Sequence, residues 1–134
     1  MLNVVIDTNV IISALLSPDG HSALIVDKIF DELLKPVYYE KILIEYTAVL
    51  ARPRFHFSIK DQINVVDGLK KYGIEIQPLP CDFHFSDESD RIFYEAAKSA
   101  NAYLVTGNAR HFPDDPLIIN PAKCVDLMNQ LYRA

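Results

Sequence analysis

Four carboxylates stand at positions that strand or helix periodicity does not explain. Asp7 directly follows the apolar run Leu2–Ile6, which predicts a buried strand, and a helical pattern begins immediately after it. Glu45 lies in a largely apolar helical segment, and Asp87 and Asp90 project from about the same side of one helix's first turn. Because open parallel sheets bind ligands where their strands end, we expect these four side chains to meet at that edge.

Carboxylates gathered in this way would need cations or protons. Two of them about 4 Å apart repel by roughly 4 kcal/mol at an effective dielectric near 20. Apart from His84, no His or Cys is near these positions in sequence, so a largely oxygen ligand set favours Mg²⁺ or Mn²⁺ over zinc. Such ions activate water for attack on phosphodiesters, so the pattern favours phosphoryl chemistry.

Each acid taken singly also has an ordinary structural explanation. Asp7 could cap the helix that follows it, and Asp87 and Asp90 could bind the first-turn amides of theirs. Glu45 could face solvent beside Lys41. The expected convergence of all four at one edge favours a shared site.

Alternating strand and helix patterns predict the elements that would position these acids. Strands are expected at 2–6, 36–38, 74–76, 102–105 and 117–119, and helices at 8–16, 21–34, 40–50, 59–72, 87–97 and 121–131. Thr8-Asn9, Ser58 and Asn120-Pro121 are read as helix starts. We therefore expect 1–134 to be one α/β domain, a three-layer α/β/α sandwich around a mostly parallel sheet.

Bulk properties narrow the class of protein. Thirteen Lys and Arg against eighteen Asp and Glu give a net charge of −5, which argues against a broadly basic nucleic-acid-binding surface but not against a metal-dependent nuclease. Cys81 and Cys124 form no metal or redox pattern and are read as reduced thiols. Asp7 interrupts the first apolar run, so we expect neither a secretory signal nor a membrane segment, and a cytoplasmic location.

Several basic, aromatic and apolar residues have two readings. Arg52 and Arg54, with Lys60 and Arg110, could form a basic rim for phosphates or a solvated surface. The Phe pairs at 55/57 and 83/85 could stack on bases, but loop Phe residues that pack inward are the more typical explanation. His111 follows the Thr106-Gly107-Asn108 turn and could approach substrate, but a surface or packing histidine is the more typical explanation. On the helix after Ser58, the stripe expected to face inward is Ile59, Ile63, Val66 and Leu69.

Ordered short blocks along nearly the whole chain resemble a known family, the PIN domain. The blocks are Val4-Val5-Ile6-Asp7-Thr8-Asn9-Val10 with Ser13, Glu45-Tyr46 before Val49-Leu50-Ala51-Arg52-Pro53, Asp87 and Asp90 before Ala96-Ala97, Leu104-Val105-Thr106-Gly107-Asn108 with His111-Phe112-Pro113, and Ile119-Asn120-Pro121. The resemblance is to bacterial PIN-domain toxins of toxin–antitoxin systems in particular.

This resemblance implies a Mg²⁺- or Mn²⁺-dependent ribonuclease with Asp7, Glu45 and Asp90 as acidic core and metal ligands. It also implies auxiliary groups that orient those acids or contact phosphate: Asn9, Ser13 and Thr106. RNA would be the substrate, and homodimers and a neutralising antitoxin the partners. The amphipathic helix after Ser58 could contribute to a groove for such a partner.

Asn108 departs from the family pattern, because many members carry a fourth acid in this block. An amide can lend an oxygen but adds no charge. Asp7, Glu45, Asp87 and Asp90 together balance two divalent ions, whereas without Asp87 one ion is easier to balance. We therefore expect one strongly held ion, a second that binds mainly with substrate, and Asp87 as an auxiliary catalytic residue.

Two other functions remain open from the sequence. A PIN-like binding module without catalysis is one, because Asn108 lacks a charge. A phosphoacceptor signalling domain of flavodoxin-like architecture is the other, although it needs an acidic pair after the first strand, where this chain has Thr8-Asn9.

Overall fold

A five-stranded parallel sheet forms the centre of the computed structural model, which describes residues 2–132. The strand order is β3-β2-β1-β4-β5, and the strands are β1 (Leu2–Ile6), β2 (Leu34–Tyr38), β3 (Ile74–Glu75), β4 (Tyr103–Val105) and β5 (Ile118–Ile119). Ile6 pairs in register with Val105, so β1 and β4 end side by side. The expected parallel α/β architecture is confirmed.

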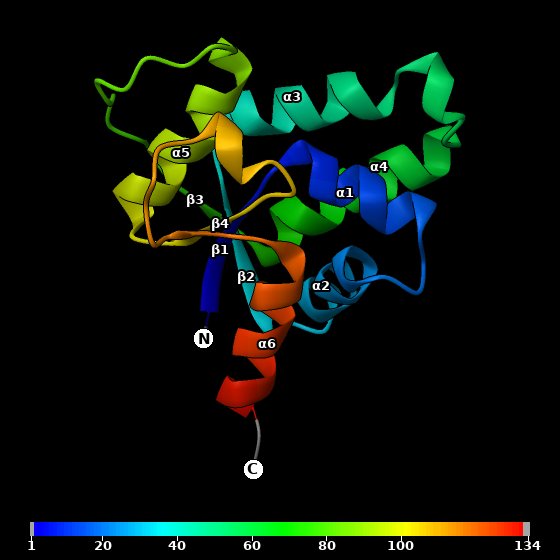
Figure 1. Cartoon of the computed structure of the whole chain (residues 1–134). Helices are drawn as coiled ribbons and strands as arrows, with labels where there is room; N and C mark the ends of the chain where they lie inside the picture. The colour runs from blue at the N-terminus through cyan, green and yellow to red at the C-terminus, as the bar shows by residue number, and fades with distance from the viewer. Residues whose placement is uncertain (1, 133–134) are drawn as a thin grey trace.

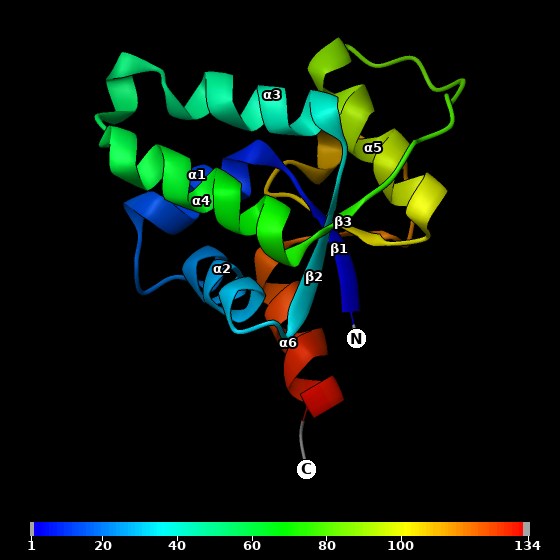
Figure 2. The same ribbon diagram turned by 180° about the vertical axis from the view of Figure 1, so that it is seen from behind.

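Helices cover both faces of this sheet and one of its edges. They are α1 (Thr8–Leu16), α2 (His21–Phe30), α3 (Glu40–Leu50), α4 (Ile59–Tyr72), α5 (Glu88–Ala100) and α6 (Pro121–Tyr132), with short 3₁₀ turns η1 (Pro53–Phe55) and η2 (Ala109–His111). Figure 1 shows α5 on one face and α1, α2, α4 and α6 on the other. Helix α3 crosses above the carboxyl ends of the strands, and the view from behind in Figure 2 agrees.

The burial of the central strand β1 explains why the sequence there is a continuous apolar run, from which a strand was predicted. Val4, Val5 and Ile6 are fully buried because helices pack on both faces of β1. Ile11, Ile25, Leu34 and Phe93 from the surrounding elements complete the core beside them. Helix α5 contacts β1, β2 and β4, so the start of α5 is held close to the end of β1.

Several expected boundaries differ from the structure: β2 begins at Leu34 rather than at residue 36, and α5 ends at Ala100 rather than at residue 97. Helix α2 ends at Phe30 rather than at residue 34, because Glu32 adopts a left-handed conformation with φ 63° and Leu34 already belongs to β2. Asp7, not Thr8-Asn9, occupies the N-cap position of α1.

The expected inward face of α4 is partly wrong. Ile59 and Ile63 are 71% and 52% exposed, whereas Val65, Gly68 and Leu69 are buried. A Cβ built on Gly68 would lie 2.1 Å from Phe30 Cζ, so the absence of a side chain lets α4 approach α2 there. The buried face is therefore set by a glycine, which hydrophobic periodicity does not count.

No single helix within residues 2–132 is long and apolar enough to cross a membrane. Helices α1 and α2 pass a test of length and composition only when joined, and they meet at a bend of 100°.

Candidate metal centre at the carboxyl edge of the sheet

The neighbouring ends of β1 and β4 bring Asp7 and Thr106 together. The Asp7 backbone N–H donates to the Val105 carbonyl at 3.0 Å, and the Thr106 hydroxyl donates to Asp7 Oδ2 at 2.7 Å. Asn9 Nδ2 donates to the same oxygen at 3.3 Å. Both side-chain donors therefore bind Oδ2, and neither binds Oδ1.

Burial sets the electrostatics of Asp7. The residue is only 6% exposed, and this desolvation raises the pKa of its carboxyl group above the ordinary value of 3.8. The hydrogen bond from Thr106 lowers the pKa but does not cancel the effect of burial. A buried carboxylate of this kind is stabilised by any cation that approaches it.

Helix α3 is fastened to the end of β1 through Tyr46. Its buried hydroxyl donates to the carbonyl of Ile6, the residue before Asp7, and its ring lies 6.0 Å from that of Phe93 in α5. Burial, and then the charge of Asp7, raise the pKa of Tyr46 well above its ordinary value. The half-buried Glu45 precedes Tyr46 and is thereby held over the same edge of the sheet.

Asp90 in the first turn of α5 completes the acidic group. Burial raises its pKa to about 6, with further contributions from the negative charges of Asp7, Asp87 and Glu45. His111 opposes the effect, since its Nδ1 lies 3.7 Å from Asp90 Oδ2. The other carboxylates expected to converge are therefore close enough to Asp90 for their charges to raise its pKa.

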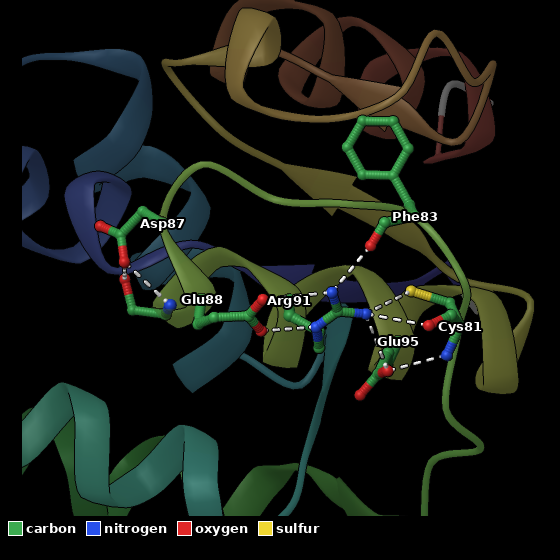
Figure 3. Close-up of polar contacts among 7 residues, drawn as sticks. Cys81, Phe83, Asp87, Glu88, Arg91 and Glu95 are labelled. Carbon is green, nitrogen blue, oxygen red and sulfur yellow. Dashed lines mark hydrogen bonds and ion pairs between the residues drawn. The ribbon is translucent and has the colours of Figure 1, made fainter.

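Asp87 has a clear structural role at the start of α5. Its Oδ1 accepts hydrogen bonds from the Ser89 backbone N–H at 2.9 Å and from the Ser89 hydroxyl at 2.8 Å (Figure 3). These bonds lower the pKa of the exposed Asp87 carboxyl group. The capping role considered for Asp87 is thus present, and its role as an auxiliary ligand stays a prediction.

The donor set fits a hard divalent ion, although it is not a closed cage. Among residues 2–132, no three His, Cys, Asp or Glu side chains form a ready-made metal-binding group. Mg²⁺ usually retains several waters and binds through only one or two carboxylates, so a full set of protein ligands is unnecessary. A bound cation would relieve the repulsion between Asp90 and the negative charges around it.

Comparison with known proteins identifies the family. The PIN domain family matches residues 3–110, a range that includes Asp7, Glu45, Asp87, Asp90 and Thr106 but ends one residue before His111. The chain belongs to the PIN domain family. PIN domains are generally metal-dependent nucleases that use divalent ions.

One similar protein comes from an archaeon, and its name gives no activity. The chain is 29% identical over 110 residues to an uncharacterized protein of Methanocaldococcus jannaschii, covering 80% of this chain and 71% of the relative. No solved structure matches. Because this relative is archaeal and uncharacterized, the resemblance to bacterial toxins stays a prediction.

The expected auxiliary residues of this PIN domain separate into two groups. Asn9 and Thr106 bind Asp7, and Asn9 Oδ1 also accepts from the Gly107 N–H at 3.2 Å. The Asn108 backbone N–H donates to Thr106 Oγ1 at 3.0 Å. Asn108 itself is exposed. Ser13 is exposed on α1, and its side chain makes no hydrogen bond to any residue from 2 to 132.

Arg52 and Arg54 lie away from the acids of the PIN domain. They belong to the segment around η1, which follows the end of α3 farthest from α5 (Figures 1 and 2). The guanidinium of Arg54 lies over the Phe55 ring, 4.8 Å from its centroid. The structure therefore does not bring these two arginines to the acidic group.

The basic residues beside the acids are instead on η2. A pocket of about 180 Å³ is lined by Phe83, His84, Ser86, Asp87, Asp90, Arg110 and His111. His111 is exposed, as expected, and its position next to Asp90 agrees with the alternative that it approaches the site. Its sequence signal was proximity to Thr106, which follows a strand at the same edge of the sheet.

Proposed function

We propose that this PIN domain is a ribonuclease that hydrolyses RNA phosphodiester bonds with the help of Mg²⁺ or Mn²⁺. The observation that carries the proposal is the convergence of acids on Asp90, whose pKa is raised to about 6 by burial and then by the charges of Asp7, Asp87 and Glu45. Perturbed carboxylates in a cleft are typical of functional sites, and here the family supplies the reaction class.

Each residue has a role in this proposal. Asp7 and Asp90 would hold the ion and Glu45 the ion or its water, with Asp87 and Asn108 assisting. When bound, the ion would supply the charge that activates water and neutralises the departing 3′ oxygen. Thr106 and Asn9 keep the Asp7 carboxylate oriented through its Oδ2.

Cleavage of single-stranded RNA by wild type and Asp7→Asn, with Mg²⁺ or Mn²⁺, tests the proposal. Asp19→Asn is the matched control, because Asp19 is an exposed acid in the turn between α1 and α2. We expect cleavage by wild type and Asp19→Asn and its loss in Asp7→Asn. Equal cleavage by all three proteins would remove the catalytic assignment.

The second candidate is a PIN-like binding module without catalysis. The neutral Asn108 favours it, since an acid here would add a charge beside Thr106. RNA binding without cleavage by wild type at any divalent ion concentration would support this candidate.

The phosphoacceptor alternative is not supported. Flavodoxin-like sheets have the strand order 2-1-3-4-5, whereas the order here is β3-β2-β1-β4-β5. Membership of the PIN domain family also points away from it.

The biological role we propose is that of a cytoplasmic toxin that forms homodimers and is neutralised by an antitoxin, as the resemblance to bacterial toxins implies. Growth arrest on expression of wild type, but not of Asp7→Asn, is the expected result. Unimpaired growth with active, soluble wild type would contradict the toxin role.

A further inference from the structure

A small pocket adjoins the acidic group between the segment 83–87 and η2. Asp90 belongs to both the pocket and the proposed metal centre. The pocket has a volume of about 180 Å³, which is below the roughly 300–1,000 Å³ typical of sites for drug-sized ligands. The space therefore suits a single phosphate or a single base rather than a larger cofactor.

Arg110 is the permanent cation of this pocket. It is exposed, and it makes no ion pair with any residue from 2 to 132. The turn that carries it is fixed, because the His111 N–H donates to the Asn108 carbonyl at 3.0 Å and Phe112 is buried just beyond. A positive charge is thus held beside the acids in a chain whose net charge is −5.

Phe83 offers an aromatic face on the same pocket. It is 40% exposed, and its ring meets the buried Phe85 ring at 4.7 Å and 73°. Phe85 in turn contacts the rings of Tyr94 and Phe112, so a buried aromatic cluster supports Phe83 from below. Phe85 packs inward as expected, whereas Phe83 does not.

Arg91 fixes the backbone of this segment. Its Nη2 donates to the Phe83 carbonyl at 2.7 Å, and its Nη1 donates to the Cys81 carbonyl at 2.9 Å. Figure 3 shows the Phe83 ring pointing away from this guanidinium. Phe83 is therefore held in place without its ring being used in the anchoring contacts.

We propose that this pocket binds the nucleotide next to the bond that is cut, in a single-stranded nucleic acid. Arg110 pairs with its phosphate and Phe83 stacks on its base, because phosphate contacts position a strand and aromatic rings stack on unpaired bases. This inference rests on the proposed function for the identity of the adjacent reaction.

Binding of a 5′-fluorescein-labelled single-stranded RNA, measured by anisotropy across a range of salt concentrations, tests the pocket. All proteins carry Asp7→Asn so that the RNA stays intact. We expect Arg110→Gln to weaken binding by about tenfold and to lower the salt slope by about one. The matched control Arg54→Gln removes the same charge at the far end of α3 and should leave both unchanged.

Phe83 is tested by a substitution and its conservative counterpart. Phe83→Leu should weaken binding by about fivefold or more with the salt slope unchanged, and Phe83→Tyr should restore it, since it keeps an aromatic face. Thermal unfolding of each variant checks that the fold is intact.

The outcomes separate the pocket from the reaction. Absence of RNA binding, or equal losses for Arg110→Gln and Arg54→Gln, would overturn the pocket even if wild type cuts RNA. Loss of binding in Arg110→Gln and Phe83→Leu while wild type cuts nothing would uphold the pocket and overturn the proposed reaction.

Discussion

Asp90→Asn should stabilise the metal-free protein at neutral pH. The folded state raises the pKa of Asp90 from 3.8 to about 6, so it holds a proton more tightly than the unfolded chain does. The stability that this group contributes is complete below pH 3.8 and is lost as the pH rises through about 6. The variant has no such group and escapes the loss.

The magnitude follows from the two pKa values and two opposing effects. The difference between 3.8 and about 6 corresponds to about 3 kcal/mol above both values. Solvent screening of a partly exposed carboxylate reduces this to about 1–2 kcal/mol. The favourable interaction of Asp90 with the N-terminus of α5 offsets another 0.3–1 kcal/mol or so. We therefore expect a gain of about 1 kcal/mol.

Urea unfolding of wild type and Asp90→Asn at pH 4 and pH 7.5 measures this difference. With EDTA, the variant should be the more stable protein at pH 7.5 and lose its advantage at pH 4. With Mn²⁺, only wild type should gain stability, because an ion bound to the folded state alone shifts the unfolding equilibrium. A variant that is no more stable than wild type in EDTA, or that responds equally to Mn²⁺, would refute the reasoning.

Three further substitutions test other contacts. Thr106→Val removes the 2.7 Å donor to buried Asp7 and should cost about 1–3 kcal/mol of unfolding free energy at pH 7, and less in acid, where Asp7 is protonated; a pH-independent loss would contradict this. Thr8→Val should raise the unfolding free energy by about 1 kcal/mol, because the buried Thr8 hydroxyl has no partner among residues 2–132; unchanged thermal stability would argue for an unseen partner. Arg91→Lys cannot keep the forked contacts to the segment around Phe83, so amide hydrogen exchange there should accelerate; unchanged exchange would show that the aromatic cluster suffices.

The position of a strand could be predicted best where helices bury both faces of the strand. Helices on both faces of β1 require a continuous apolar run, so the strand and the position of Asp7 at its end could be predicted. The convergence of Glu45 and Asp90 with Asp7 followed from the rule that strands and helices meet at the carboxyl edge, and the raised pKa of Asp90 agrees with it.

The basic side of the site could be predicted only in part, since Arg110 of the expected rim lies beside the acids and Arg52 and Arg54 do not. Arg52 and Arg54 follow the helix that carries Glu45, but helix length takes them to its far end. Arg110 is near the acids only because η2 turns back toward α5, where His111 reaches Asp90. These positions depend on tertiary path, which periodicity does not encode.

The segment between β3 and α5 was also beyond sequence reasoning. It has no regular structure before α5, and its course is set by Arg91 and the aromatic cluster around Phe85. The face of α4 was missed for a related reason, since the close approach at Gly68 depends on a neighbouring helix.

The Thr106–Asp7 hydrogen bond joins residues 99 positions apart. During translation, Asp7 and Glu45 emerge long before the residue that orients the first of them. A growing chain of one hundred residues carries all four acids but neither β4 nor Thr106, so Asp7 still lacks this anchor. Synthesis order alone thus prevents the cluster from being completed until Thr106 has left the ribosome.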